Sequence, residues 1–386
     1  GTWKRAAIFA IDTTPWAQRD SGDTTTNPAP NLVTNGRKIS DAAVYFNRLC
    51  LFGGPYIMAS QTGKLYTFFK ADSGQTVESD PLDLTVSDEQ NVSIRHAAQF
   101  EDGLILFSVS GKQFDFTGDG GLTPTTARIK TATNYQTRDV TPRVAGNELY
   151  YVGLEGHRSM LYEYRTYEET LVSAATDVST QIPTLIGNSV RSMAVSGNNR
   201  FVILCPSSSS KLYVYRAHWD GIQKKQSAWS VYEFDPSYSI NDVVTIGDRV
   251  YMLTKTANIW FIERLPILEF PDSTHYDDVV GVSSFAPSPP YYVHLDRKFY
   301  RTSGTWDGVK TTWDLGVQTP GSTVNRAVDC NDGAEYTLDY WSGTTVGITG
   351  VDLSAKSVVL GCAYTFRITL SSPFTPREDS EIGRAH

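Results

Sequence analysis

Val-Tyr-Phe-Asn-Arg-Leu-Cys-Leu-Phe, at residues 44–52, is the first copy of a pattern that recurs along the chain. The later copies lie at residues 100–107, 144–152, 195–204 and 246–253. Each copy has an apolar residue, a short turn rich in Gly, Asn and Asp, and then an apolar run. Turn residues of these types tolerate positive φ between two β-prone segments, so each copy predicts a β-hairpin.

The copies are regularly spaced. Equivalent positions are 55, 45, 52 and 49 residues apart when they are marked by Leu49, Leu104, Leu149, Phe201 and Val250. A strand repeat of roughly 40–50 residues is typical of β-propeller blades. A further strand-like run follows each hairpin, at residues 63–69, 111–116, 160–165, 211–216 and 258–263, and residues 230–234 suit an outer fourth strand. We therefore expect an all-β chain with a β-propeller of about five to six irregular blades.

The repeat also divides the chain. Residues 1–38 form a lead-in, with a strand-like run at 6–11 and a turn-rich loop at 12–37, and the predicted propeller blades occupy residues 39–265. The pattern fails at a proline-rich stretch, and short β-like runs then predict a small β module at residues 266–376, inserted in the propeller or appended to it. Residues 377–386 read as the start of a further strand, and the chain as a piece of a longer polypeptide. The best helical candidate is short, at residues 167–175.

Composition restricts the class of protein. The 386 residues are 40% hydrophobic and 12% aromatic, so burying a core is not difficult, and the aromatic content favours strands. The net charge of −8 does not attract nucleic acid to the protein as a whole. The four cysteines are far apart, which predicts buried free thiols rather than a disulfide framework. No apolar run approaches the ~20 residues that a membrane helix needs, so we expect no membrane-spanning segment.

Motifs for known chemistry are missing from the sequence. Gly63-Lys64 and Gly111-Lys112 lack the earlier glycine and the following Ser or Thr of a phosphate-binding loop. The six histidines show no metal-ligand spacing, and the glycine-rich turn at 115–121 lacks the acidic core and the closing Glu of a calcium loop. No GxSxG nucleophile elbow occurs. We therefore assign no catalytic, cofactor-binding or metal-binding residue and expect no cofactor and no enzymatic activity.

Two site hypotheses stay open beside this interpretation. Asp80 with Asp83, or Asp277 with Asp278, could flank a sugar as the acid and base of a glycoside hydrolase. Aromatic residues with basic neighbours could stack single-stranded nucleic acid, although their alternation suits packing between blades better; they are Tyr162, Tyr164, Arg165, Tyr213, Tyr215 and Arg216. A propeller that binds a carbohydrate or a protein at its central face is a third alternative.

A series of short motifs in fixed order resembles one family, the tail tubular protein B (nozzle) proteins of short-tailed double-stranded DNA bacteriophages. The resemblance covers most of residues 16–265 and is sketchier from 266 to 376. The motifs lie at residues 16–19, 22–23, 26–28, 39–41, 45–49, 79–83, 94–97, 103–108, 122–127, 226–230 and 382–384. Residues 50–52 depart from the family's usual continuation, which affects packing rather than the assignment.

The resemblance implies a structural virion protein at the distal end of the tail. Family members form a homohexameric nozzle through which double-stranded DNA passes transiently during ejection. They join the tail adaptor, tail tubular protein A, and support the tail fibres, for which residues 266–376 are the expected docking or tip region. The family brings no accepted catalytic residues, and a tail-associated glycoside hydrolase stays an alternative. An acidic conduit suits this role, because phosphate neutralisation by Lys and Arg would hold the DNA.

Overall fold

A computed structural model describes residues 16–87, 92–108, 111–167, 172–187, 189–197, 201–219, 224–246, 249–265, 293, 295–318, 323–365, 374–376 and 382–384. The chain divides into two compact units, Thr2–Phe270 and Pro271–His386. The domain limits predicted at residues 38, 265 and 376 stay predictions. The predicted strand at residues 6–11 lies outside the described residues.

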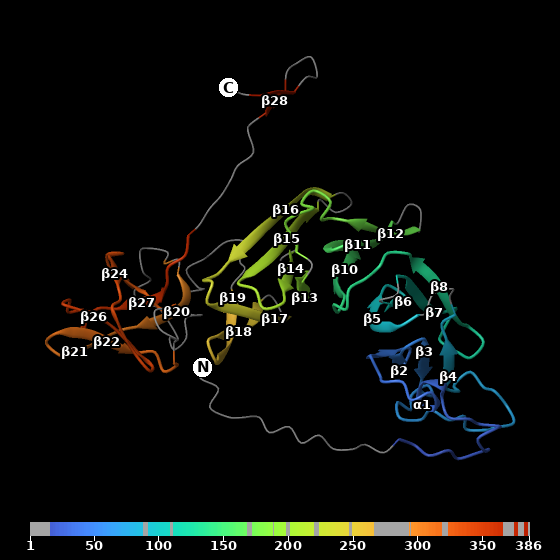
Figure 1. Ribbon diagram of the computed structural model, residues 1–386. Helices are drawn as coiled ribbons and strands as arrows, with labels where there is room; N and C mark the ends of the chain where they lie inside the picture. Colours follow the sequence, from blue (N-terminus) through green and yellow to red (C-terminus); the bar gives the residue numbers. More distant parts are fainter. Residues whose placement is uncertain are drawn as a thin grey trace. The chain divides into compact units, whose positions relative to one another are not determined.

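Five antiparallel sheets follow one another along the first unit (Figure 1). The first holds β1 (Asp41–Tyr45), β2 (Arg48–Gly53), β3 (Tyr56–Ala59) and β4 (Leu82–Thr85). The second holds β5 (Ile94–Phe100), β6 (Gly103–Ser108), β7 (Gln113–Gly118) and β8 (Ala127–Thr133). The third holds β9 (Arg143–Ala145), β10 (Glu148–Glu155), β11 (Arg158–Tyr167) and β12 (Val172–Asp177). The fourth holds β13 (Val190–Ser196), β14 (Phe201–Pro206), β15 (Lys211–Trp219) and β16 (Lys224–Glu233), and the fifth β17 (Tyr238–Ile246), β18 (Arg249–Thr256) and β19 (Ile259–Leu265).

Each sheet is a meander in which strands pair with their neighbours in sequence. Every repeated stretch identified in the sequence is the hairpin that joins the first two strands of a sheet. In the first hairpin the turn residues are Phe46 and Asn47, with φ of 46° and 57°, and Arg48 already belongs to β2. Consecutive meanders of four short strands are the architecture of propeller blades, which confirms the predicted all-β, propeller-type fold.

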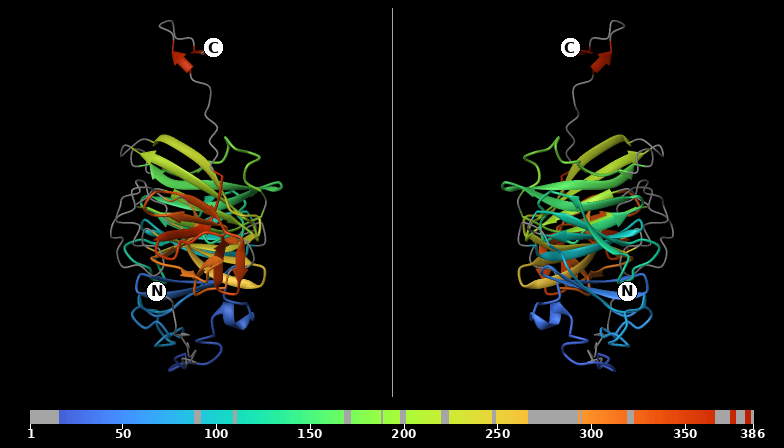
Figure 2. Two further views of the ribbon diagram at one scale, coloured as in Figure 1. Left: turned by 90° about the vertical axis from the view of Figure 1, so that its left-hand side faces the viewer. Right: turned by 90° about the vertical axis from the view of Figure 1, so that its right-hand side faces the viewer.

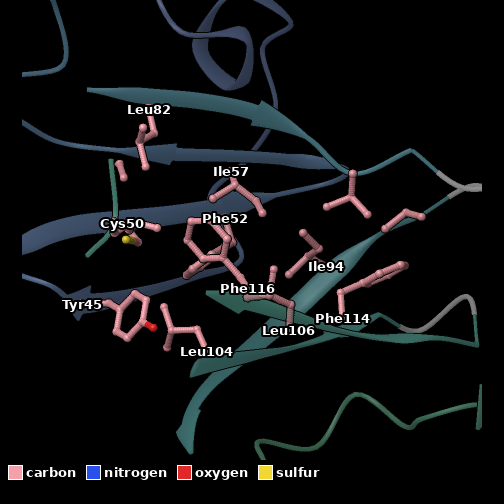
Figure 3. Close-up of a cluster of buried hydrophobic side chains, with 14 residues drawn as sticks. Tyr45, Cys50, Phe52, Ile57, Leu82, Ile94, Leu104, Leu106, Phe114 and Phe116 are labelled. Atoms are coloured by element: carbon pink, nitrogen blue, oxygen red, sulfur yellow. The ribbon is translucent and has the colours of Figure 1, made fainter. Parts of the chain in front are cut away.

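The sheets are layered face to face, and an apolar core lies between each sheet and the next. Between the first two sheets, Phe52 and Ile57 meet Ile94 and Leu106 (Figure 3). Three further cores lie between the second and third, the third and fourth, and the fourth and fifth sheets. The views in Figure 2, turned by 90° from Figure 1, look along the series of sheets, which overlap in projection. The central strands β6 and β14 are buried along their whole length because both of their faces are covered, which explains their continuous apolar sequences.

Two local predictions were wrong. Residues 63–69 do not form a strand; the third strand of the first sheet is β3, and residues 61–70 fold into turns closed by the bonds Gln61 N to Thr67 O and Lys64 N to Gln61 O. The best helical candidate, residues 167–175, is not a helix either, because β11 runs to Tyr167 and β12 begins at Val172. The helix that the structure does describe, α1 (Asn31–Thr34), lies in the lead-in and follows Pro30.

The second unit contains two four-stranded sheets that share one core. The first pairs strands in the order β20 (Asp296–Arg301), β27 (Val358–Cys362), β23 (Arg326–Asp329) and β24 (Glu335–Thr337). The second has the order β21 (Thr305–Trp306), β22 (Lys310–Asp314), β26 (Thr345–Thr349) and β25 (Tyr340–Ser342). Phe299 and Leu360 of one sheet pack with Trp313 and Val346 of the other, which makes a small β-sandwich. Strands β28 (Phe374–Pro376) and β29 (Ile382–Arg384) pair with each other.

All four cysteines are free and buried. Burial raises the pKa of Cys50 and of Cys205 to about 12, and that of Cys330 to about 11. Because the thiolate is the reactive form, we expect Ellman's reagent at pH 8 to leave the folded protein unmodified and to titrate four thiols after unfolding. A thiol that reacts stoichiometrically within minutes in the folded protein would contradict this burial.

Candidate functional site

A cleft of about 260 Å³ lies between the third and fourth sheets. Its walls come from the turn before β10, from β10 and β11, and from β13, β14 and β15. Gly146, at φ 65°, makes the first of two turns that approach each other here. A Cβ added to Gly197 would lie 3.2 Å from the amide nitrogen of Gly146, so a side chain at this position would crowd the approach. The aromatic rings of Tyr150, Phe201 and Tyr215 line the cleft.

A polar group of four side chains lies where Tyr150 and Tyr215 line the cleft, and Lys224 in it is half-buried while the other three are buried. The Nζ of Lys224 lies 2.7 Å and 2.8 Å from the two carboxylate oxygens of Glu163. It also donates to the hydroxyl of Tyr215 at 3.1 Å, and the hydroxyl of Tyr150 donates to Glu163 at 3.1 Å. Burial would lower the pKa of Lys224, but its bonds to Glu163 and Tyr215 hold that pKa above the ordinary value. Burial and the Glu163 carboxylate both raise the pKa of Tyr150.

A second ion pair lines the cleft itself. The Nη1 of Arg165 lies 4.0 Å from Oε1 of Glu148, and both side chains are mostly buried. Glu163 is therefore paired with Lys224, and Glu148 with Arg165. The arrangement supplies fixed charges and hydrogen-bonding groups for a polar ligand, and it does not place two carboxylates together for acid–base chemistry.

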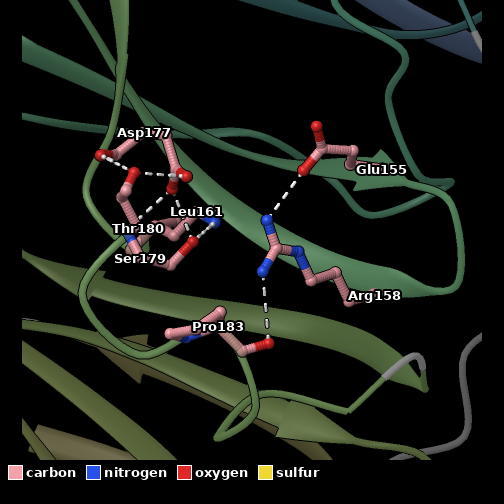
Figure 4. A network of polar contacts seen from close by, with 7 residues as sticks. All are labelled: Glu155, Arg158, Leu161, Asp177, Ser179, Thr180 and Pro183. Atoms are coloured by element: carbon pink, nitrogen blue, oxygen red, sulfur yellow. Dashed lines mark hydrogen bonds and ion pairs between the residues drawn. The ribbon is translucent and has the colours of Figure 1, made fainter.

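The connection from the third to the fourth sheet is held by side chains (Figure 4). Asp177 accepts hydrogen bonds from the amide and hydroxyl of Ser179 and from the hydroxyl of Thr180. Arg158 donates to Glu155 at 2.8 Å and to the carbonyl of Pro183 at 3.4 Å. These contacts hold the first part of the loop that leads from β12 to β13.

The acidic pairs considered from the sequence do not form a hydrolase site in the described part of the chain. Asp80 is fully buried and accepts the amide of Val77 at 2.9 Å. Asp83 accepts the backbone amide and the side-chain amide of Asn31, at 3.0 Å and 2.9 Å. Burial raises the pKa of Asp83, and the Asn31 bonds oppose that effect. Each of these carboxylates thus has a structural partner, while Asp277 and Asp278 lie outside the described residues.

The other sequence candidates are also part of the scaffold. Gly63 lies in the turns after β3, and Asp115 belongs to strand β7. Within the described ranges, no three His, Cys, Asp or Glu side chains are grouped so as to hold a metal ion. Tyr162 and Tyr164 are buried between the second and third sheets, and Tyr215 between the third and fourth. These rings pack between sheets rather than forming an open stacking surface.

The sequence gives little indication of Lys224, because the doublet Lys224-Lys225 holds only two charges and does not make a basic patch. Glu163 lies 61 residues away in sequence, so only the packing of the third sheet on the fourth brings the pair together. The alternation of Glu163 with Tyr162 and Tyr164 in β11 was the one local signal, since it places the carboxylate on the opposite face from the two rings.

Consecutive antiparallel meanders packed face to face define a propeller-type protein. The profile of the bacteriophage nozzle protein family matches residues 5–385, which is nearly the whole chain. The chain belongs to the bacteriophage nozzle protein family, and it is a structural component of the distal virion tail. No helix among the described residues is long and apolar enough to cross a membrane.

One curated relative and several solved structures give a measure of this likeness. Tail tubular protein gp12 of Escherichia phage T7 is 25% identical over 309 residues, which are 79% of this chain and 37% of that protein. YCF48 bound to D1 peptide is 12% identical, with 93% of this chain and 100% of that chain covered and a TM-score of 0.38. The β-propeller domain of Cps50 (Swd1) from Myceliophteria thermophila is 9% identical, with 60% and 74% covered and a TM-score of 0.38.

Proposed function

We propose that this chain forms part of the wall of a tail nozzle through which double-stranded DNA is ejected, and that it acts mechanically, without catalysis. The observation that carries the proposal is the continuous series of apolar cores between the five sheets of the first unit. A stack held in this way is a rigid body of fixed shape, because packed interiors resist deformation. Rigid subunits of one shape are suited to a closed ring of cyclic symmetry.

The charge of the chain suits a conduit rather than a DNA-binding surface. The net charge is −8, and a DNA-binding protein would gain its affinity from Lys and Arg that neutralise phosphates. A wall that bound phosphates would retain the DNA that it has to release. We expect the surface that faces the DNA to be neutral or acidic.

Membership of the family supports a proposed assembly. In it, the subunits form a homohexameric ring, the ring joins the tail adaptor (tail tubular protein A), and the tail fibres dock on it. The β-sandwich of the second unit, within residues 266–376, is the proposed fibre-docking or tip region, because it is a separately folded module with its own core.

DNA binding tests the passive character of the conduit. We expect fluorescence anisotropy with a short labelled duplex to show no binding at physiological salt and no steep dependence of affinity on salt concentration. Tight binding that falls steeply as salt is added would show a basic track on the protein and would contradict a wall that lets DNA slide.

The cleft between the third and fourth sheets favours a second candidate function, the binding of a small carbohydrate. The paired charges of Glu148 and Arg165 in its wall are groups that can hydrogen-bond the hydroxyls of a sugar. Binding on a glycan array that is lost in Glu148→Gln and kept in Lys225→Met would support this function. A flat array, together with no release of reducing sugar from bacterial glycans, would exclude both binding and hydrolysis.

A further inference from the structure

Each of the first four sheets in the first unit has one face covered by the sheet that follows it. The second sheet covers the first through Ile94 and Leu104, and the third covers the second through Leu149 and Tyr151. The fourth covers the third through Val202 and Leu204, and the fifth covers the fourth. A blade of this kind therefore uses two apolar faces, one for each neighbour.

The fifth sheet has a second apolar face that no described sheet of this unit covers. Its covered face contributes Val243, Val250 and Met252 to the core shared with the fourth sheet. On the opposite face, Ile262 is 80% exposed, Ile246 64% and Trp260 52%, and Val244 and Leu253 are exposed as well. We call these five residues the uncovered face.

The uncovered face is continuous across the sheet. Leu253 of β18 lies directly opposite Ile262 of β19, and Lys255 opposite Trp260. The Nζ of Lys255 lies 5.4 Å from the centre of the Trp260 ring, so the aliphatic part of the lysine extends the apolar surface. Soluble proteins rarely leave such a patch on one sheet open to water, and patches of this kind mark interaction sites.

The first sheet cannot serve as the partner through its own free face. Leu51 and Met58 on that face are buried against Leu32 of α1 and Phe68 of the following loop. The ring of Trp16 lies 4.9 Å from that of Phe68 and adds to the cover. The lead-in thus closes the stack at its first sheet, while nothing in the described part of the unit closes it at the fifth.

We infer that the uncovered face is the docking surface for a further blade, supplied by the same polypeptide outside these 386 residues. The chain spans 37% of the length of its T7 relative, so a family member of that length has ample chain for another sheet. Because each sheet in the stack packs an aliphatic face on its neighbour, we expect the occupant to be a twisted β-sheet with one aliphatic face.

Substitution of Ile262 in the natural full-length polypeptide tests the inference. Ile262→Lys places a charge against the docked blade, and we expect its melting temperature to fall by at least about 2–4 °C. The matched control is Val44→Lys, another exposed β-branched residue in a strand, which we expect to leave the melting temperature unchanged. Equal melting temperatures for the two variants would overturn the inference.

Cross-linking from Lys255 identifies the occupant. With a mixture of isotopically light and heavy full-length protein, we expect cross-links from Lys255 to residues outside the 386 within the same chain. Cross-links between light and heavy copies would show that a second copy covers the face, and cross-links to residues 293–365 would show that the β-sandwich does; either result overturns the inference. If no cross-link forms, amide hydrogen exchange of β19 is compared between the full-length protein and the 386-residue chain. Slower exchange in the full-length protein would show that a blade covers β19, and equally fast exchange would show that none does.

Discussion

Replacing Arg48 by alanine is expected to lower the free energy of unfolding by about 3–5 kcal/mol, which is a large part of the stability of a typical domain. Arg48 is fully buried at the start of β2. Its Nη1 donates to the carbonyl oxygens of Ser60 and Asp80, at 2.7 Å and 2.6 Å, and its Nη2 donates to that of Glu78 at 2.7 Å. The guanidinium thus holds the long connection between β3 and β4 against the first sheet.

The size of this effect follows from what the substitution leaves behind. Burial lowers the pKa of Arg48, and the nearby Asp80 works in the opposite direction. Without the guanidinium, the buried carbonyl groups of Ser60 and Asp80 and the part-buried one of Glu78 lose a donor, and the buried carboxylate of Asp80 loses the nearby positive charge. Lysine cannot restore the fork of donors, so Arg48→Lys should recover only part of the loss.

Urea denaturation measures this prediction, with Arg95→Ala as the control because Arg95 is an exposed arginine on the neighbouring strand β5. The control should change the free energy of unfolding by no more than about 0.5 kcal/mol. Equal stabilities for Arg48→Ala and Arg95→Ala would show that the buried guanidinium does not hold the loop.

Replacing Lys224 by methionine should destabilise the protein by a similar amount, about 3–5 kcal/mol. Methionine keeps the apolar length of the side chain and removes the ammonium that lies 2.7 Å and 2.8 Å from Glu163. The carboxylate of Glu163 is then left buried with only the hydroxyl of Tyr150 described as a donor. Lys225→Met is the matched control, because the adjacent lysine is exposed, and it should be close to neutral.

A double-mutant cycle separates the pair from its surroundings. Glu163→Leu combined with Lys224→Met removes both charges, and the double variant should be more stable than Lys224→Met alone. The pKa of Lys224 is raised on folding, so its stabilising effect is complete below the unfolded pKa near 10.4 and is lost as the pH rises through the folded pKa. A double variant no more stable than the single one would indicate that the ion pair is not the source of the loss.

The sequence predicted the fold well where the signal is local. The five hairpins depend on turn residues and adjacent apolar runs, and the structure places a hairpin at each of them. The third strand of the first sheet was misplaced because residues 63–69 alternate like a strand, while their conformation depends on contacts far along the chain. Phe68 is buried against Leu51 and Met58, and Arg48 binds carbonyls that lie 30 to 32 residues away in sequence.

The candidate site could not be predicted in the same way. The cleft and the Lys224–Glu163 pair exist only because the third sheet packs on the fourth, and no spacing within one strand reveals that contact. The resemblance to nozzle proteins supplied the function because many short motifs keep their order along the chain, and the family match over residues 5–385 confirms it.

Electron cryomicroscopy of the intact phage particle tests the central claim, that this chain is a structural wall subunit of the tail nozzle. We predict that the five-sheet stack of the first unit fits density at the distal end of the tail in six copies around a central channel, with neutral or acidic side chains facing that channel. A tail map in which the stack fits no density around the channel, or in which it lines the channel with a continuous basic stripe, would contradict the account.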